Sequence, residues 1–145
     1  MYDVRTSYLE NAVATATPAR LVTMLYDRLL LDLDRAAVAL RDGHELVGRG
    51  HVDHAQDIVS ELMNSLDQDA WEGGPALMNL YTYLVAELLG VQGAGDVDKV
   101  VACRELLAPL ADAWHQAAEA VAEPAAPVPT ATASGGATGG LLGIG

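Results

Sequence analysis

The residues of this chain that could do chemistry are its histidines, some of its aspartates and its single cysteine. His51 and His54 lie three residues apart, with Asp57 three further on, so one helix face would present all three to a metal ion. Asp112 and His115 form a second pair with this spacing. Di-metal centres in helical bundles take a Glu from two helices and a Glu-x-x-His pair from each of the other two, which neither pair matches. We therefore interpret these residues as polar side chains of a solvated helix face, and we expect no metal and no cofactor.

Cys103 is the next candidate, as a nucleophile. A nucleophilic site needs a base and an orienting group beside the nucleophile, whereas Cys103 falls on the apolar stripe of a predicted helix, where burial raises the pKa of a thiol. The sequence also contains no G-x-S-x-G motif, phosphate-binding loop or dinucleotide fingerprint. We expect no catalytic residue and no enzyme. A single cysteine cannot form an internal disulfide, which agrees with a reducing compartment.

The elements that must position these side chains are helices, because apolar residues recur every three or four positions along four segments. The first predicted helix spans 18–41: Thr17 can cap it, Pro18 suits its first position, and Asp42-Gly43 ends it. The others span about 44–66, 75–90 and 97–123. Amphipathic helices joined by short loops predict an all-α fold, an antiparallel up-down four-helix bundle.

The last predicted helix carries the most regular apolar stripe, although Pro109 lies inside it. The stripe consists of Val100, Cys103, Leu107, Leu110, Trp114, Ala117 and Val121. Because they lie on such regular stripes, Leu25, Leu62, Leu107 and Trp114 are expected in the core.

Both ends of the chain differ from the bundle domain, which we place at residues 18–123. Residues 1–17 carry too few apolar side chains for a core of their own and are predicted to be a flexible N-terminal arm. Residues 124–145 are rich in Pro and Gly and carry no charge, which predicts a disordered tail.

The net charge of −12 argues against nucleic acid as a partner, because an acidic surface repels phosphate. Residues 42–70 hold seven acids against one Arg, a net −6, whereas residues 18–41 hold four Arg against three Asp, a net +1. Asp53, Asp57 and Glu61 recur every four residues and should face water. No apolar run approaches the roughly 20 residues that cross a bilayer. The first residues also lack a secretory signal, so we expect a cytoplasmic protein without membrane insertion.

Several short stretches, in order and at matching separations, resemble the motifs of one family. They are Tyr8-Leu9-Glu10-Asn11-Ala12-Val13, Thr15-Ala16-Thr17-Pro18 with Met24-Leu25-Tyr26-Asp27, Ala55-Gln56-Asp57-Ile58-Val59-Ser60-Glu61-Leu62 with Ser65-Leu66-Asp67, Asn79-Leu80-Tyr81-Thr82-Tyr83-Leu84, and Asp112-Ala113-Trp114-His115-Gln116-Ala117. Over about residues 8–118 the chain resembles the FliS family of flagellar secretion chaperones. It departs from the family pattern at Arg28, where Gly is common, and at Val85-Ala86-Glu87, where a basic pair is common.

The resemblance implies a protein that holds newly made flagellin monomeric in the cytoplasm before type III export. It would grip the disordered C-terminal segment of flagellin in an apolar groove between helices and deliver it to a component of the export gate. The expected groove residues are Tyr26, Ile58, Met63, Asn79, Tyr81 and Tyr83. The expected lid, which covers the empty groove and is linked to docking at the gate, is the arm with Tyr8, Leu9 and Val13.

Two other classes of function stay open at this point. A structural or adaptor bundle could associate with itself through the same apolar faces, which would give a homodimer without a client. A metal-binding bundle enzyme is the third alternative. Light scattering with and without a flagellin peptide distinguishes the first two classes, and elemental analysis tests the third.

Overall fold

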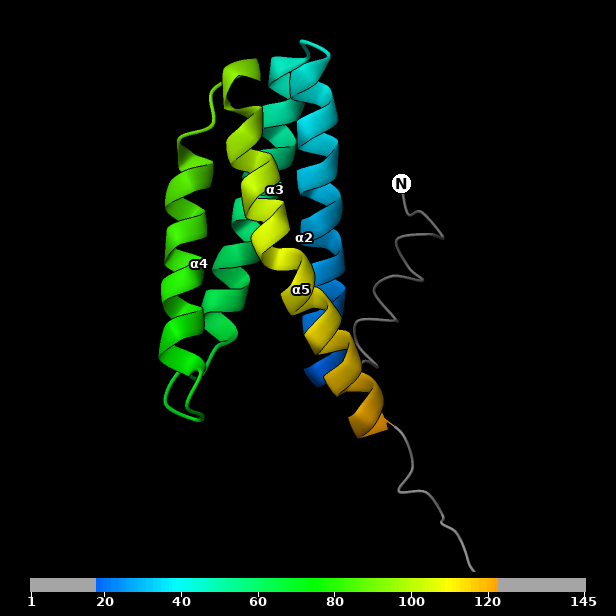
Figure 1. Cartoon of the computed structure of the whole chain (residues 1–145), viewed down its shortest axis with the longest axis vertical. Coiled ribbons are helices and arrows are strands. Elements are labelled where there is room, and N and C mark those ends of the chain that lie inside the picture. The colour runs from blue at the N-terminus through cyan, green and yellow to red at the C-terminus, as the bar shows by residue number, and fades with distance from the viewer. Residues whose placement is uncertain (1–17, 123–145) are drawn as a thin grey trace, which may run out of the picture. The chain divides into compact units, whose positions relative to one another are not determined.

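Residues 18–122 are described by a computed structural model, in which they form four α-helices, a short 3-10 helix and no strand (Figure 1). The elements are α2 (Pro18–Arg41), α3 (Glu45–Ser65), α4 (Gly74–Leu89), η1 (Ala94–Asp96) and α5 (Val97–Ala122). The all-helical class is therefore confirmed, and α2 has the predicted bounds. The N-terminal arm (1–17) and the C-terminal tail (124–145) lie outside the described residues.

The chain divides into two compact units at Trp114. The described part of the first unit is 18–114, which contains α2, α3, α4, η1 and α5 as far as Trp114. The described part of the second unit is 115–122, the last turns of α5. Within residues 18–122, the large cluster of buried apolar residues and the hollows described below lie in the first unit.

The turn between α2 and α3 explains why these helices are neighbours. Gly43 has a φ of 83°, the left-handed conformation that glycine adopts most readily. The N–H of Gly43 donates to the carbonyl of Leu40, and the N–H of His44 donates to that of Ala39 at 2.8 Å, so carbonyls at the end of α2 are satisfied. With so short a connection, α3 returns along α2 and packs against it.

A single cluster of buried apolar side chains joins the four helices of the first unit. Its largest fully buried members are two tyrosines, Tyr26 of α2 and Tyr81 of α4, together with leucines of every helix except α3. From α3 the cluster takes Val52, Ala55, Ile58, Val59 and Leu62. Leu62 and Leu107 lie in the core as predicted, whereas Leu25 and Trp114 are partly buried at its edge.

Gly48 of α3 is packed closely against α2. A Cβ atom at this position would lie 2.6 Å from the Cδ2 atom of Leu40, whose side chain is fully buried. The helix continues without interruption through both Gly48 and Gly50. Gly50 has no neighbour within 4 Å of its Cβ position.

The stripe predicted for α5 holds up to Pro109 and changes after it. Val100, Cys103 and Leu107 are buried, but the next buried residue is Ala111, and Leu110 is only partly buried. Ala117 and Val121, predicted to continue the stripe, are exposed. The stripe therefore shifts by one position beyond a residue that cannot donate a helix hydrogen bond.

Replacing each of the two glycines of α3 with alanine should have opposite effects. Gly50→Ala is expected to stabilise the protein by about 1 kcal/mol, because alanine favours the helix and meets no neighbour. Gly48→Ala gains the same propensity but must displace the buried Leu40, an overpacking that costs roughly 1–3 kcal/mol. Urea unfolding followed by circular dichroism measures both free energies of unfolding. Equal stabilisation by the two substitutions would contradict the close packing at Gly48.

Candidate functional site

An apolar groove lies between the first turns of α2 and the last turns of α3, and we call it the α2–α3 groove. Its volume is about 590 Å³. It is lined by Pro18, Leu21, Val22, Met24 and Leu25 of α2 and by Glu61 and Ser65 of α3. The leucines, Val22 and Met24 are only partly buried, so apolar surface remains open here to another molecule.

A second, smaller hollow adjoins the α2–α3 groove, and we call it the tryptophan pocket. It has a volume of about 250 Å³ and shares Val22 and Ser65 with the groove. Its other lining residues are Leu62, Leu66, Asp67, Ala70, Trp71, Leu77, Tyr81 and Trp114. Together the two hollows present aliphatic and indole side chains from α2, α3, α4 and α5, which suits an apolar helical segment rather than a small polar substrate.

A hydrogen bond between two tyrosines lies at the base of this site. The hydroxyls of Tyr26 and Tyr81 are 2.7 Å apart, and both side chains are almost completely buried. Burial raises the pKa of each phenol, and for Tyr81 the hydroxyl of Tyr26 raises it further. The ring of Tyr26 also lies 6.3 Å from that of Trp114, between their centroids. This pair therefore fixes α2 against α4 beneath the tryptophan pocket.

The other predicted groove residues do not gather at these two hollows. Ile58 is buried and Met63 is partly buried against the core. Asn79 and Tyr83 are exposed on α4, with Tyr83 51% accessible. Of the predicted set, Tyr81 lines the tryptophan pocket, whereas the other five line neither hollow. Tyr8, Leu9 and Val13 lie outside the described residues. Contact of these residues with a partner stays a prediction.

Sequence reasoning missed Leu21, Val22 and Met24 as site residues. Together with Leu25 they give four apolar residues within five positions. Such a run covers a wider part of the helix surface than the single apolar stripe that packs against one neighbouring helix. That width was a usable signal. Trp71 lies between the second and third predicted helices and gave no such signal, because its place in the pocket depends on the fold of the connection between α3 and α4.

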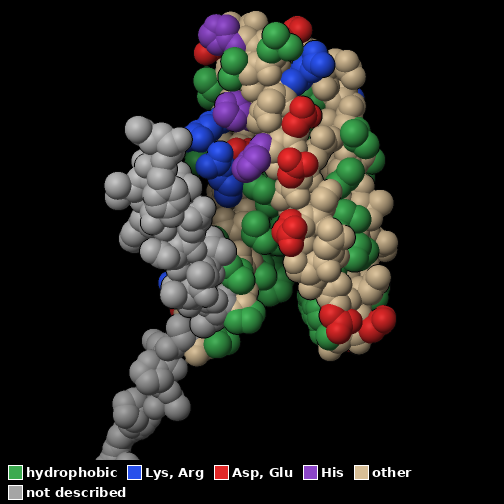
Figure 2. All heavy atoms as spheres, turned by 180° about the vertical axis from the view of Figure 1, so that it is seen from behind, with side chains coloured by type: hydrophobic (Ala, Val, Ile, Leu, Met, Phe, Trp, Pro, Cys, Tyr) green, Lys and Arg blue, Asp and Glu red, His purple; other side chains and the backbone are tan. Residues whose placement is uncertain are grey.

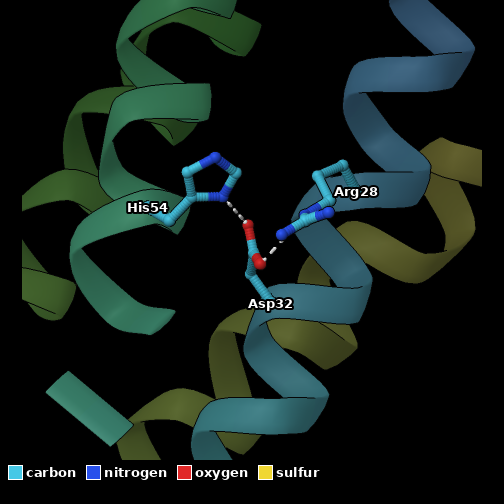
Figure 3. Close-up of polar contacts among 3 residues, drawn as sticks. All are labelled: Arg28, Asp32 and His54. Atoms are coloured by element: carbon cyan, nitrogen blue, oxygen red, sulfur yellow. Dashed lines mark hydrogen bonds and ion pairs between the residues drawn. The ribbon is translucent and has the colours of Figure 1, made fainter. Parts of the chain in front are cut away.

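Asp32 is a further residue that no sequence pattern singled out. Its side chain is completely buried, yet it lies three residues after Leu29 and four before Ala36, on the core face of α2. One carboxylate oxygen, Oδ1, accepts a hydrogen bond from Nε of Arg28 at 3.1 Å. The other, Oδ2, is bonded to Nδ1 of His54 on α3 (Figure 3). A buried carboxylate is costly unless it is bonded, and here both oxygens have partners.

The histidines considered above as metal ligands are not arranged around a common point. Within residues 18–122, no group of three His, Cys, Asp or Glu side chains could hold a metal ion. His54 directs its Nδ1 atom to Asp32. Asp53, Asp57 and Glu61 are all exposed as predicted, and Figure 2 shows acidic side chains in a row on one face, next to histidine and basic side chains.

Cys103 is buried in α5, 1% accessible, as predicted for a core thiol. Burial, and to a lesser extent the charge of Glu87, raises its pKa to about 11. A thiol with this pKa is almost fully protonated at neutral pH, which disfavours nucleophilic reactivity.

The helices of residues 18–122 include none that is long and apolar enough to cross a membrane.

Comparison with known proteins shows which family this chain is similar to. A family model described as "Flagellar protein FliS" matches residues 1–121. The chain is 35% identical over 111 residues to the flagellar secretion chaperone FliS of Escherichia coli, an alignment covering 74% of this chain and 81% of that protein. It is 33% identical over 113 residues to the protein of the same name from Salmonella typhimurium, covering 74% and 82%. It is 29% identical over 112 residues to that of Bacillus subtilis, covering 77% and 84%.

The raised pKa of Cys103 predicts that the protein loses stability at alkaline pH. Its folded pKa of about 11 lies above the ordinary value of 9.0, so between these values the unfolded chain binds fewer protons than the folded chain. The free energy of unfolding should therefore be unaffected by this thiol below about pH 9 and fall as the pH rises above it. Urea unfolding at a series of pH values tests this. The fall should be shallower in the Cys103→Ala variant, where Tyr26 and Tyr81 still contribute, and equal slopes in both proteins would contradict the assignment.

Proposed function

Because the chain belongs to the FliS family of flagellar secretion chaperones, we propose that it keeps flagellin monomeric before export by binding its disordered C-terminal segment in the α2–α3 groove and the tryptophan pocket. The family is one of chaperones rather than enzymes, and the matched relatives carry that name. The observation that carries the proposal is the run of partly buried apolar side chains around Val22, which both hollows share.

The shape of the site supports a helical client segment. Helices form the walls of the groove, and an incoming amphipathic helix can lay apolar residues spaced three and four apart along them. A segment that is disordered when free pays the entropy of ordering as it binds, so apolar burial must supply the affinity. The net charge of −12 keeps copies of the chaperone apart while the groove itself stays nearly uncharged.

The exposed face of α4 is proposed as an outer contact for a longer client segment. It carries Asn79 and Tyr83, together with Leu89, which is 66% accessible. Glu87 is the single charged residue of this helix. A helix with a single charged residue on so acidic a chain is compatible with an apolar partner.

Three further parts of the proposal concern the cell and the arm. The protein is proposed to act in the cytoplasm and to deliver flagellin to a component of the flagellar export gate. The arm, with Tyr8, Leu9 and Val13, is proposed to cover the empty groove and to be displaced by flagellin.

The alternative is an adaptor that uses the same apolar surface to bind a second copy of itself. Light scattering with and without a flagellin peptide distinguishes these, because an adaptor would be dimeric before any peptide is added.

Charged substitutions in the α2–α3 groove should weaken binding of a flagellin C-terminal peptide. Leu21→Glu and Met24→Glu each place a carboxylate against apolar surface, and we expect the dissociation constant in calorimetry to rise about tenfold or more. Leu46→Glu is the matched control, since Leu46 is 79% accessible and lies outside the groove. Binding that is equally strong in all three variants would place the client elsewhere.

Deletion of residues 1–14 should tighten binding of the same peptide, because the client no longer displaces a tethered competitor. The empty protein should at the same time associate with itself more readily in light scattering, since apolar surface is uncovered. Loss of peptide binding with unchanged helical content would show instead that the arm is part of the binding surface.

A further inference from the structure

The contacts between α2 and α3 follow one another in a fixed order along the two helices. At one end, Gly48 of α3 packs against the buried Leu40 of α2. In the middle, Asp32 of α2 is bonded to His54 of α3. At the other end the two helices form the walls of the α2–α3 groove. The bond between Asp32 and His54 thus lies between the end where Gly48 packs tightly against Leu40 and the end where the helices leave space.

The distance between this bond and the groove is short. Leu25 precedes Asp32 by seven residues and Glu61 follows His54 by seven, so each groove residue lies about 10 Å along its helix from the bond. Because both helices are stiff over two turns, their separation at the groove depends on how they are held at Asp32 and His54. The groove volume is therefore a consequence of this contact as well as of the side chains that line it.

The contact between Asp32 and His54 is a hydrogen bond to a buried carboxylate, which holds the two side chains in one orientation. Its carboxylate is completely buried, whereas Arg28 and His54 are each 48% accessible at the side chain. Arg28 lies one turn away on the same helix and cannot fix α3. The Nδ1–H of His54 supplies the bond that crosses from α3 to α2 (Figure 3). A buried carboxylate keeps its partner in place because an unmade hydrogen bond there costs more than an apolar contact.

We propose that the hydrogen bond between Asp32 and His54 sets the width of the α2–α3 groove, so that both are positioning residues for the client segment. The part that concerns the client rests on the proposed function, whereas the part that concerns groove width does not. Neither residue lines the groove, and both act through the spacing of the two helices.

The test compares three variants. One removes this bond, one keeps it, and one leaves it intact while breaking a different contact between helices. His54→Ala removes the donor, whereas His54→Asn places a neutral amide N–H near the position of Nδ1 and keeps it. Arg104→Ala is the matched control, because it breaks a different ion pair between helices, the 2.9 Å contact of Arg104 with Asp34. In the Cys103→Ala background, spin labels at positions 19 and 64 report the separation of α2 and α3 beside the groove.

The distance distribution between the labels is expected to broaden or shift in His54→Ala and to remain as in the parent in His54→Asn and Arg104→Ala. Affinity for the flagellin peptide should fall about tenfold in His54→Ala and stay within about twofold in the other two. An unchanged distribution in His54→Ala, or no recovery in His54→Asn, would overturn the proposal. If the parent does not bind the peptide, the proposed client is wrong, and the label distances alone decide whether the bond sets the groove.

Discussion

Close packing between α2 and α3 depends on the absence of a side chain at Gly48, because a Cβ atom there would overlap the buried Leu40. The turn at Gly43 brings the helices together, and buried alanines near the end of α2 let them approach. Toward the start of α2 the side chains beside α3 are longer, and they are only partly covered. The gradient in side-chain size along one helix thus accounts for a firm core at one end of the pair and a groove at the other.

Polar contacts then determine how the helices are oriented within this packing. The hydroxyl pair of Tyr26 and Tyr81 fixes α2 against α4, and the carboxylate of Asp32 fixes α2 against α3. Leucines and alanines can exchange neighbours at low cost, whereas a buried hydroxyl or carboxylate must keep its partner. Both contacts lie within a few turns of the apolar hollows, so the shape of these hollows is held by a small number of directional bonds.

Much of the fold was predictable from the sequence because its signals are local. Pro18 and the Asp42-Gly43 pair mark the ends of α2, and apolar spacing marks the other helices. The residues of the candidate site were harder to predict from the sequence. Tyr26 and Tyr81 are predicted as groove residues, and no local pattern indicates that their hydroxyls meet across 55 positions of sequence. Leu21 and Met24 were not predicted as site residues, because the sequence does not say which side of a helix lacks a neighbour. Such features depend on tertiary packing, which single-sequence periodicity does not contain.

The tryptophan pocket has one more property. The chain contains two tryptophans, Trp71 and Trp114, and both line this pocket, one from the connection between α3 and α4 and the other from α5. Trp114 is also close enough to Tyr26 to accept excitation energy from it. The indole emission of the folded protein therefore originates entirely at the surface proposed for the client, so its wavelength and intensity would report occupancy of that surface without any added fluorophore.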